Sequence, residues 1–166
     1  MTKFKIWPAV AAGTAAGIIA GMVKMGWENI LPPRTPARDA TNPPQKTLEK
    51  IGFSSQAAHA TCHYNGHDLP WPSYLIHYTF SATFGIGYTV LGHYIPVLKA
   101  GHGLAAGTAA WASAHLMVLP AMGIIPEAKE QPVEEHLSEL LGHMLWMWTI
   151  DAVGRTFYSR FPSTKE

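Results

Sequence analysis

Three long stretches of this chain contain no charged residue. They cover residues 6–23, 69–98 and 101–126 and are rich in glycine, alanine, large aliphatic and aromatic residues. About 20 helical residues are enough to cross the roughly 30 Å hydrocarbon core of a bilayer. The pattern therefore predicts three transmembrane helices. These helices are expected at about 6–27, 71–95 and 102–121.

A fourth stretch, at about 134–157, has the composition of a helix but is less apolar. It contains Glu139 and Asp151, which are costly in lipid unless they face protein or water, so we expect this helix to carry function. Asp151 lies four residues before Arg155, and this spacing favours an ion pair on the helix surface. The predicted fold is all-α: a four-helix transmembrane bundle formed by one domain, 1–166.

Between the first two predicted helices, residues 28–70 carry the helix breakers Pro36, Pro43, Pro44 and Gly52. We expect a long extramembrane loop here. At the N-terminus, a cleaved signal peptide is the alternative to a first span, because a basic start precedes the apolar run. The glycine- and alanine-rich composition of that run and the further apolar stretches favour a retained span.

The composition agrees with a chain that contacts the lipid bilayer. Hydrophobic residues make up 48% of the sequence and charged residues only 14%, against about 25% charged residues in a typical soluble domain. The net charge of +1 and the absence of a long basic run argue against a nucleic-acid partner. Cys62 is the single cysteine, so no disulfide can form within the chain.

The distribution of lysine and arginine predicts the orientation. If all four helices cross the bilayer, the basic residues of the short flanks fall on one side, which should be the cytoplasm. Both termini would then be cytoplasmic, and the long loop would lie outside. The basic residues on the predicted inner side are Lys3, Lys5, Lys99, Arg155, Arg160 and Lys165.

Small residues recur at helical spacing in the first predicted helix. Gly13, Gly17 and Gly21 repeat every four residues, a spacing that lets another helix backbone approach closely in lipid. The partner helix could belong to the same chain or to another copy, and we expect a homo-oligomer formed through such faces. The string AAGTAA occurs at 11–16 and again at 105–110, which either reflects two duplicated helical hairpins or arises by chance.

Four ionisable side chains are predicted to lie at one depth. At a rise of about 1.5 Å per residue, His77 lies roughly 9 Å below the outer end of its helix. His115 precedes the outer end of the third helix by a similar distance, and Glu139 and His143 follow the start of the fourth. Glu139 and His143 are four residues apart and share a helix face. The remaining candidates, near the outer end of the first helix, are Lys24 and Glu28.

This layer allows three interpretations. Histidine titrates close to physiological pH, so the layer could sense or relay protons. Imidazole and carboxylate groups are also ligands of transition metals, and the nearby Trp146 and Trp148 would suit a haem pocket. Alternatively, the polar groups only hydrogen-bond between helices. An ionisable glutamate inside a span favours a functional role.

A second group of possible metal ligands lies in the predicted loop, where His59, Cys62, His63 and His67 are close in sequence. The group lacks a second ligand pair at the spacing of a zinc site, so we expect a solvated loop. The sequence also contains no nucleophile elbow, phosphate loop or dinucleotide fingerprint, and an enzymatic activity is not predicted.

Several segments resemble the YagU family of bacterial inner-membrane proteins. The resemblance covers all four predicted helices and includes VKMGWE at 23–28, LPPR at 31–34, FGIGY at 84–88 and PAMG at 120–123. His136 and the loop cluster lie outside this pattern. The family-like positions with ionisable side chains are Lys24, Glu28, Arg34, His77, His115, Glu139 and His143.

The resemblance implies a multi-pass protein of the bacterial inner membrane, in a family associated with acid resistance. Combined with the predicted layer, it suggests a protonatable histidine and glutamate site that faces the periplasm, and a proton or ion pathway is one mechanism for it. The alternatives are a membrane protein that binds a metal or haem, with His77, His115, Glu139 and His143 as metal ligands, and a structural or accessory membrane subunit.

Overall fold

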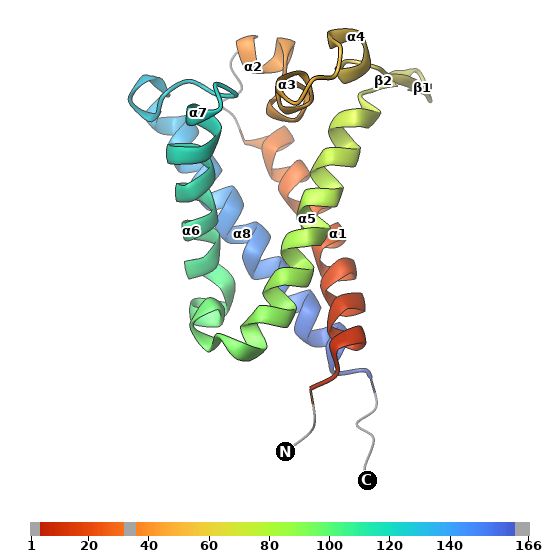
Figure 1. Cartoon of the computed structure of the whole chain (residues 1–166), viewed down its shortest axis with the longest axis vertical. Helices are drawn as coiled ribbons and strands as arrows, with labels where there is room; N and C mark the ends of the chain where they lie inside the picture. The colour runs from red at the N-terminus through yellow and green to blue at the C-terminus, as the bar shows by residue number, and fades with distance from the viewer. Residues whose placement is uncertain (1–3, 32–35, 162–166) are drawn as a thin grey trace.

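The computed structural model describes residues 4–31 and 36–161, apart from the side chains of residues 37 and 39. The chain is mostly helical, and its long helices run roughly parallel to one axis of the molecule (Figure 1). The long helices are α1 (Ile6–Ile30), α5 (Trp71–Tyr94), α6 (Leu104–Ser113) and α8 (Val133–Tyr158). Both termini lie at the same end (Figure 1).

These helices lie close to the ranges predicted from the sequence. The third differs in form, because Pro96–Gly103 is a 3-10 segment with non-helical backbone at residues 100–102 and α6 begins at Leu104. Among the described residues, two helical stretches are long and apolar enough to cross a membrane by length and composition, Ile6–Ile30 and Pro96–Ala121. Helix hydropathy thus supports the first and third predicted spans, and the four-helix transmembrane bundle stays a prediction.

Residues expected to form a loop are instead largely structured. The segment contains α2 (Pro36–Ala40), α3 (Pro43–Lys50), α4 (Ser55–Ala58), and a hairpin of β1 (Cys62–Tyr64) and β2 (His67–Leu69). Asn42 and Gln45 form a reciprocal capping box that starts α3 despite its two prolines, which are tolerated in a first helical turn. Prolines thus begin α2 and α3 rather than prevent them. Figure 1 shows these elements gathered at the end opposite the termini.

Helices α1 and α5 touch through their backbones. A Cβ on Gly17 would lie 2.3 Å from the Ser81 carbonyl oxygen, and one on Gly13 would lie 2.6 Å from the Gly85 carbonyl oxygen. The glycine stripe of α1 is therefore occupied by a helix of the same chain. Of the two partners that the sequence left open for this face, the structure shows the one within the chain, and a homo-oligomer stays a prediction.

The second AAGTAA string, like the first, contains a glycine that contacts the backbone of a neighbouring helix. A Cβ on Gly107 of α6 would lie 2.6 Å from the His143 carbonyl oxygen of α8. Each string thus places a glycine against the backbone of a partner helix within the chain, α1 on α5 and α6 on α8. Helix α8 also packs along α1 and joins the two pairs.

A compact core lies where α1, α5 and α8 meet. Trp146 and Ile150 of α8 are fully buried against Ala16, and Tyr88 of α5 belongs to the same cluster. The Trp146 indole donates a hydrogen bond of 2.7 Å to the Ser81 hydroxyl. This hydrogen bond offsets the desolvation of the indole N–H when the large side chain is buried. The core forms the floor beneath the site described next.

The predicted pair between Asp151 and Arg155 is present near the terminal end, with 2.8 Å between Arg155 Nη2 and Asp151 Oδ2. Asp151 is buried, and its other carboxylate oxygen accepts a hydrogen bond of 3.0 Å from the Tyr88 hydroxyl. His102, in the turn before α6, lies 3.4 Å from the same carboxylate. The ion pair is thus confirmed and also ties α5 and this turn to α8.

Candidate functional site

Glu139 is the centre of a buried network of charged side chains. The Lys24 ammonium of α1 lies 3.2 Å from Glu139 Oε2, and Arg38 of α2 pairs with Glu139 Oε1. Arg38 Nη1 also lies 2.5 Å from Glu135, and Lys24 pairs with Glu28 one turn further along α1. A buried carboxylate is stable only when such partners compensate for its lost hydration. The network joins α1, α2 and α8.

Two histidines stand beside the same carboxylate. His115 Nε2 lies 3.5 Å and His143 Nδ1 lies 3.8 Å from Glu139 Oε2. The imidazole rings meet edge to face, with 5.0 Å between their centroids. His143 Nδ1 also lies 2.8 Å from the Glu139 carbonyl oxygen, one turn back on α8, and this contact fixes its ring. Both histidines are buried.

The helix that carries His115 widens at this point. Residues Ala114–Val118 form a π-helical turn, and the Leu119 N–H donates to the Ala114 carbonyl five residues back. Pro120 follows within α7 (Leu119–Ala121). Proline has no N–H and clashes with the carbonyl four residues before it, which disfavours a regular α-helix here. Such π turns are frequent at functional sites.

The predicted site residue His77 takes another position, and so does His136, which lies outside the family-like pattern. His77 Nε2 lies 2.9 Å from the Gly21 carbonyl oxygen, so its ring is held against α1 rather than beside Glu139. His136 Nε2 lies 2.8 Å from the Ala128 carbonyl oxygen, at the start of α8. Arg34 lies outside the described residues. The structure therefore brings together Lys24, Glu28, His115, Glu139 and His143 from the predicted set.

Arg38 and Glu135 complete the network, although the sequence analysis did not select them. Burial disfavours the charged form of Arg38, but the neighbouring Glu139 and Glu135 outweigh it and raise the pKa of the guanidinium above its usual value. Arg38 lies in a proline-flanked segment without a hydrophobic pattern. Glu135 is in the first turn of α8, where an acidic residue is commonly solvent-exposed. Neither signal points to a buried site.

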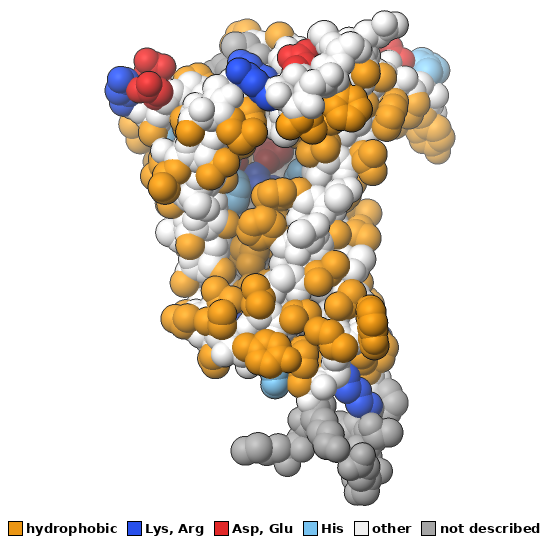
Figure 2. Space-filling model, viewed as in Figure 1, with side chains coloured by type: hydrophobic (Ala, Val, Ile, Leu, Met, Phe, Trp, Pro, Cys, Tyr) orange, Lys and Arg blue, Asp and Glu red, His pale blue; other side chains and the backbone are white. Residues whose placement is uncertain are grey.

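A cavity of about 650 Å³ lies beside this network. Figure 2 shows it as a hollow in the side of the molecule, with acidic, basic and histidine side chains visible at its bottom. Helix α5 contributes Phe80 and Phe84 to one wall, α6 contributes Ala110 and Ser113 to the other, and Trp146 of α8 lies at the base. The cavity is thus polar around Glu139 and apolar along the helices.

His115, Glu139 and His143 could hold a metal ion by distance, because a ligand atom from each lies within 4.8 Å of the others. In the described part of the chain they are the single group of three or more possible ligands with this spacing. Lys24 and Arg38 compete for the Glu139 carboxylate, and their positive charges disfavour a bound cation. The donor set fits a metal only if these two cations move away.

The comparisons with known proteins agree with the sequence resemblance. Residues 18–152 match a family described as protein of unknown function (DUF1440). The chain is also 31% identical to inner membrane protein YagU of Escherichia coli (strain K12) over 175 positions, which cover 92% of this chain and 85% of the relative. The chain belongs to the YagU family. No solved structure matches it.

Membership of the YagU family supports a location in the inner membrane, in agreement with the apolar helices. The segment that matches the DUF1440 description contains all the charged and histidine side chains of the site, from Lys24 to His143. It ends within α8, just after Asp151. The buried ion pairs around Glu139 therefore lie within the matched region, whereas Arg155, the partner of Asp151, lies just beyond its end.

The histidines between α4 and α5 do not form a comparable cluster in this YagU family member. Cys62 is exposed at the start of the hairpin, and His63 Nδ1 lies 2.9 Å from Asp68 on the opposite strand. His59 faces Glu49 instead, with 3.4 Å between His59 Nε2 and Glu49 Oε1. The segment that was expected to be a loop thus contains a hairpin, and His59 and His63 pair with carboxylates.

Proposed function

We propose that this protein supports acid resistance through the histidine and glutamate site around Glu139, which faces the periplasm. The observation that carries the proposal is the position of His115 and His143 beside a carboxylate already paired with Lys24 and Arg38. Four cationic or protonatable groups surround the Glu139 carboxylate, and two of them, Lys24 and Arg38, also pair with Glu28 and Glu135. The local charge balance therefore depends directly on the number of bound protons.

The proposal includes four membrane spans, formed by α1, α5, α6 with its extension to Ala121, and α8. The termini are cytoplasmic and α2–α4 are periplasmic. Lys99 and Arg155 support this orientation, because both line one small cavity at the terminal end. Basic residues in the short flanks of membrane spans are typical of the cytoplasmic side.

Protons that enter the site would weaken the contacts that hold α2. A proton on Glu139 removes the negative charge that pairs with Arg38 and Lys24, and a proton on either histidine adds a positive charge beside Lys24. The groups facing this centre come from α1, α2, α8 and the π turn before α7. Acidification would thus act on four elements at once.

The site is better suited to respond to protons than to conduct them. Beneath it, Trp146, Ile150 and Tyr88 form a buried layer with Ala16 and Ala20 of α1. The large cavity reaches Trp146 but not Ile150 or Tyr88. A proton or ion pathway would require this layer to open, and flux measurements in proteoliposomes test that mechanism.

Replacing both buried histidines is expected to abolish the contribution to acid survival. The variant His115→Gln/His143→Gln keeps hydrogen-bonding side chains but cannot take up protons in the same range. Cells that make the variant at the normal level should survive acid challenge no better than cells lacking the protein. His63→Gln is the matched control, because His63 is exposed in the hairpin. Undiminished survival of the double variant would contradict the proposal.

A second candidate is a metal site, supported by the three ligand atoms of His115, Glu139 and His143 within 4.8 Å. Purified protein should then contain about one equivalent of a transition metal by elemental analysis, and His143→Ala should lose it. The visible spectrum of the same sample detects haem, for which Trp146 and the histidines would form the pocket. Metal-free and colourless protein with full activity in acid survival excludes both cofactors.

A further inference from the structure

We propose that the large cavity binds a membrane amphiphile, whose apolar chain enters sideways between α5 and α6. Helix α5 packs on α1 and α6 packs on α8, so α5 and α6 form opposite walls of the cavity. Figure 2 shows the hollow from the side of the molecule, between these two helices. Both walls belong to the proposed spans, so this opening faces lipid.

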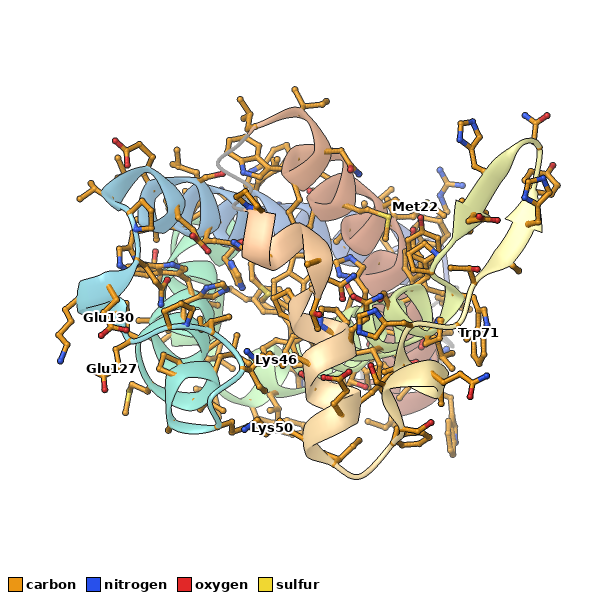
Figure 3. All side chains as sticks on the ribbon, turned by 90° about the horizontal axis from the view of Figure 1, so that it is seen from above. Met22, Lys46, Lys50, Trp71, Glu127 and Glu130 are labelled. Atoms are coloured by element: carbon orange, nitrogen blue, oxygen red, sulfur yellow. The ribbon has the colours of Figure 1, made fainter. Side chains whose placement is uncertain are left out.

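The periplasmic end of the cavity is covered. Pro43, Pro44 and Thr47 of α3 line the cavity from above together with the buried Ile124. Seen from above, Lys46 and Lys50 project from α3 toward the segment around α7 (Figure 3). The cover favours entry of a ligand from the bilayer over entry from the aqueous phase.

The lining changes character along the axis of the helices. Near α2 and α3 it contains charged and hydroxyl groups, such as Ser73 beside Asn42. Further from α3 the lining is apolar and aromatic, with Phe80, Phe84 and Trp146 packed together at ring-centroid distances of 4.6 to 6.1 Å. Such a gradient fits a molecule with a polar head and an apolar chain.

The charges at the polar end select the head group. Among the described residues that line the cavity, the cations Lys24 and Arg38 face the three carboxylates of Glu28, Glu135 and Glu139. The three carboxylates outnumber the two cations with which they pair, and Glu28, the partner of Lys24, is the most exposed of the three, with 37% of its side chain exposed. This arrangement favours a head with an ammonium group over a purely anionic head. A zwitterionic phospholipid with a primary amine has this chemistry.

Fluorescence quenching by brominated lipids tests the proposal in reconstituted membranes. Trp146 is 2% exposed and lines the cavity, whereas Trp148 is 47% exposed and reports surrounding lipid. In variants that keep one tryptophan, brominated phosphatidylethanolamine should quench Trp146 more than brominated phosphatidylglycerol does. Trp148 should respond equally to both lipids. An unquenched Trp146 overturns the proposal, and equal quenching by both lipids overturns the head-group assignment.

A variant that narrows the opening provides the matched control. Ser113 lines the cavity and is exposed on α6, so Ser113→Phe adds a ring at the entrance without changing the core. We expect weaker quenching of Trp146 and unchanged quenching of Trp148. Unchanged quenching of Trp146 would show that lipid does not enter here. An entrance covered by a second copy of the chain would instead give a Ser113→Cys crosslink between copies and no quenching of Trp146, which also overturns the proposal.

Native mass spectrometry of the full chain is independent of the tryptophan substitutions. Protein released from nanodiscs containing equal amounts of the two unbrominated lipids should retain phosphatidylethanolamine preferentially. Ser113→Phe should reduce this retained lipid severalfold. Retention of phosphatidylglycerol instead, or equal retention by the variant, would overturn the proposal.

Discussion

Gly17→Leu is expected to prevent folding of the protein. A Cβ at this position would stand 2.3 Å from the Ser81 carbonyl oxygen and 2.6 Å from the Ala82 Cα, so the new side chain meets backbone rather than a movable side chain. Helices α1 and α5 would have to separate along the contact that also includes Gly13 and Gly85. The cost should exceed the about 1–3 kcal/mol typical of extra methylene groups in a packed core.

Thermal unfolding in detergent and the yield of monodisperse protein measure this effect. Gly26→Leu is the matched control on the same helix, because no atom lies within 4 Å of a Cβ at Gly26. The control should fold with nearly normal stability. If the Gly17→Leu and Gly26→Leu variants unfold at the same temperature, the inference that the backbones of α1 and α5 are in direct contact at Gly17 is wrong.

Glu139→Gln is expected to be the most damaging substitution within the polar site. It leaves Lys24 and Arg38 without the carboxylate that they share, in a region where the Lys24 side chain is only 10% exposed. Removal of one partner from a buried ion pair typically costs about 3–5 kcal/mol. Because Lys24 keeps Glu28 and Arg38 keeps Glu135 as partners, the cost here should lie at the lower end of that range. Thermal unfolding should therefore begin at a clearly lower temperature, and α2 should become accessible to proteases.

A double substitution tests whether the destabilisation by Glu139→Gln comes from unbalanced charge rather than from altered packing. Lys24→Met/Glu139→Gln removes one cation together with the anion and should recover part of the lost stability. Glu134→Gln, at an exposed position of the same helix, should have little effect. A double variant no more stable than Glu139→Gln alone would mean that Lys24 and Glu139 are not energetically coupled.

The long helices could be predicted from the sequence because their signal is local. A run without charged residues at 69–98 leads almost directly to α5, and the leucine-, methionine- and tryptophan-rich stretch leads to α8. The short helices could not be predicted in the same way. Pro36 and Pro43 begin helices in the structure, whereas a proline alone indicates only that a helix does not continue through it.

The sequence predicted the depth of each site residue along its helix, but not the direction in which its side chain points. His115, Glu139 and His143 share both a level and a direction, so the estimate from helical rise brought them together. His77 shares the level, but its side chain contacts α1. Rotation of each helix about its axis depends on packing, here on the glycine contacts of α1 and α6, and the sequence pattern does not specify it.

Arg38 could not be predicted as a site residue for a different reason. It reaches Glu135 and Glu139 across 97 and 101 residues of sequence, and its own segment carries no hydrophobic pattern that would indicate burial. An isolated arginine in such a segment is usually solvent-exposed. Only the position of α2 over the end of the bundle makes it part of the site.

The partners of Lys24 become available at different times during synthesis of the chain. Glu139 follows Lys24 by 115 residues, so at about 5–20 residues per second the ribosome adds it on the order of ten seconds later. Throughout that interval α1 carries a cation whose final partner does not yet exist. Glu28 is only four residues away and can neutralise Lys24 almost at once. Glu28 is therefore available as a counter-ion of Lys24 before α8 has been synthesised.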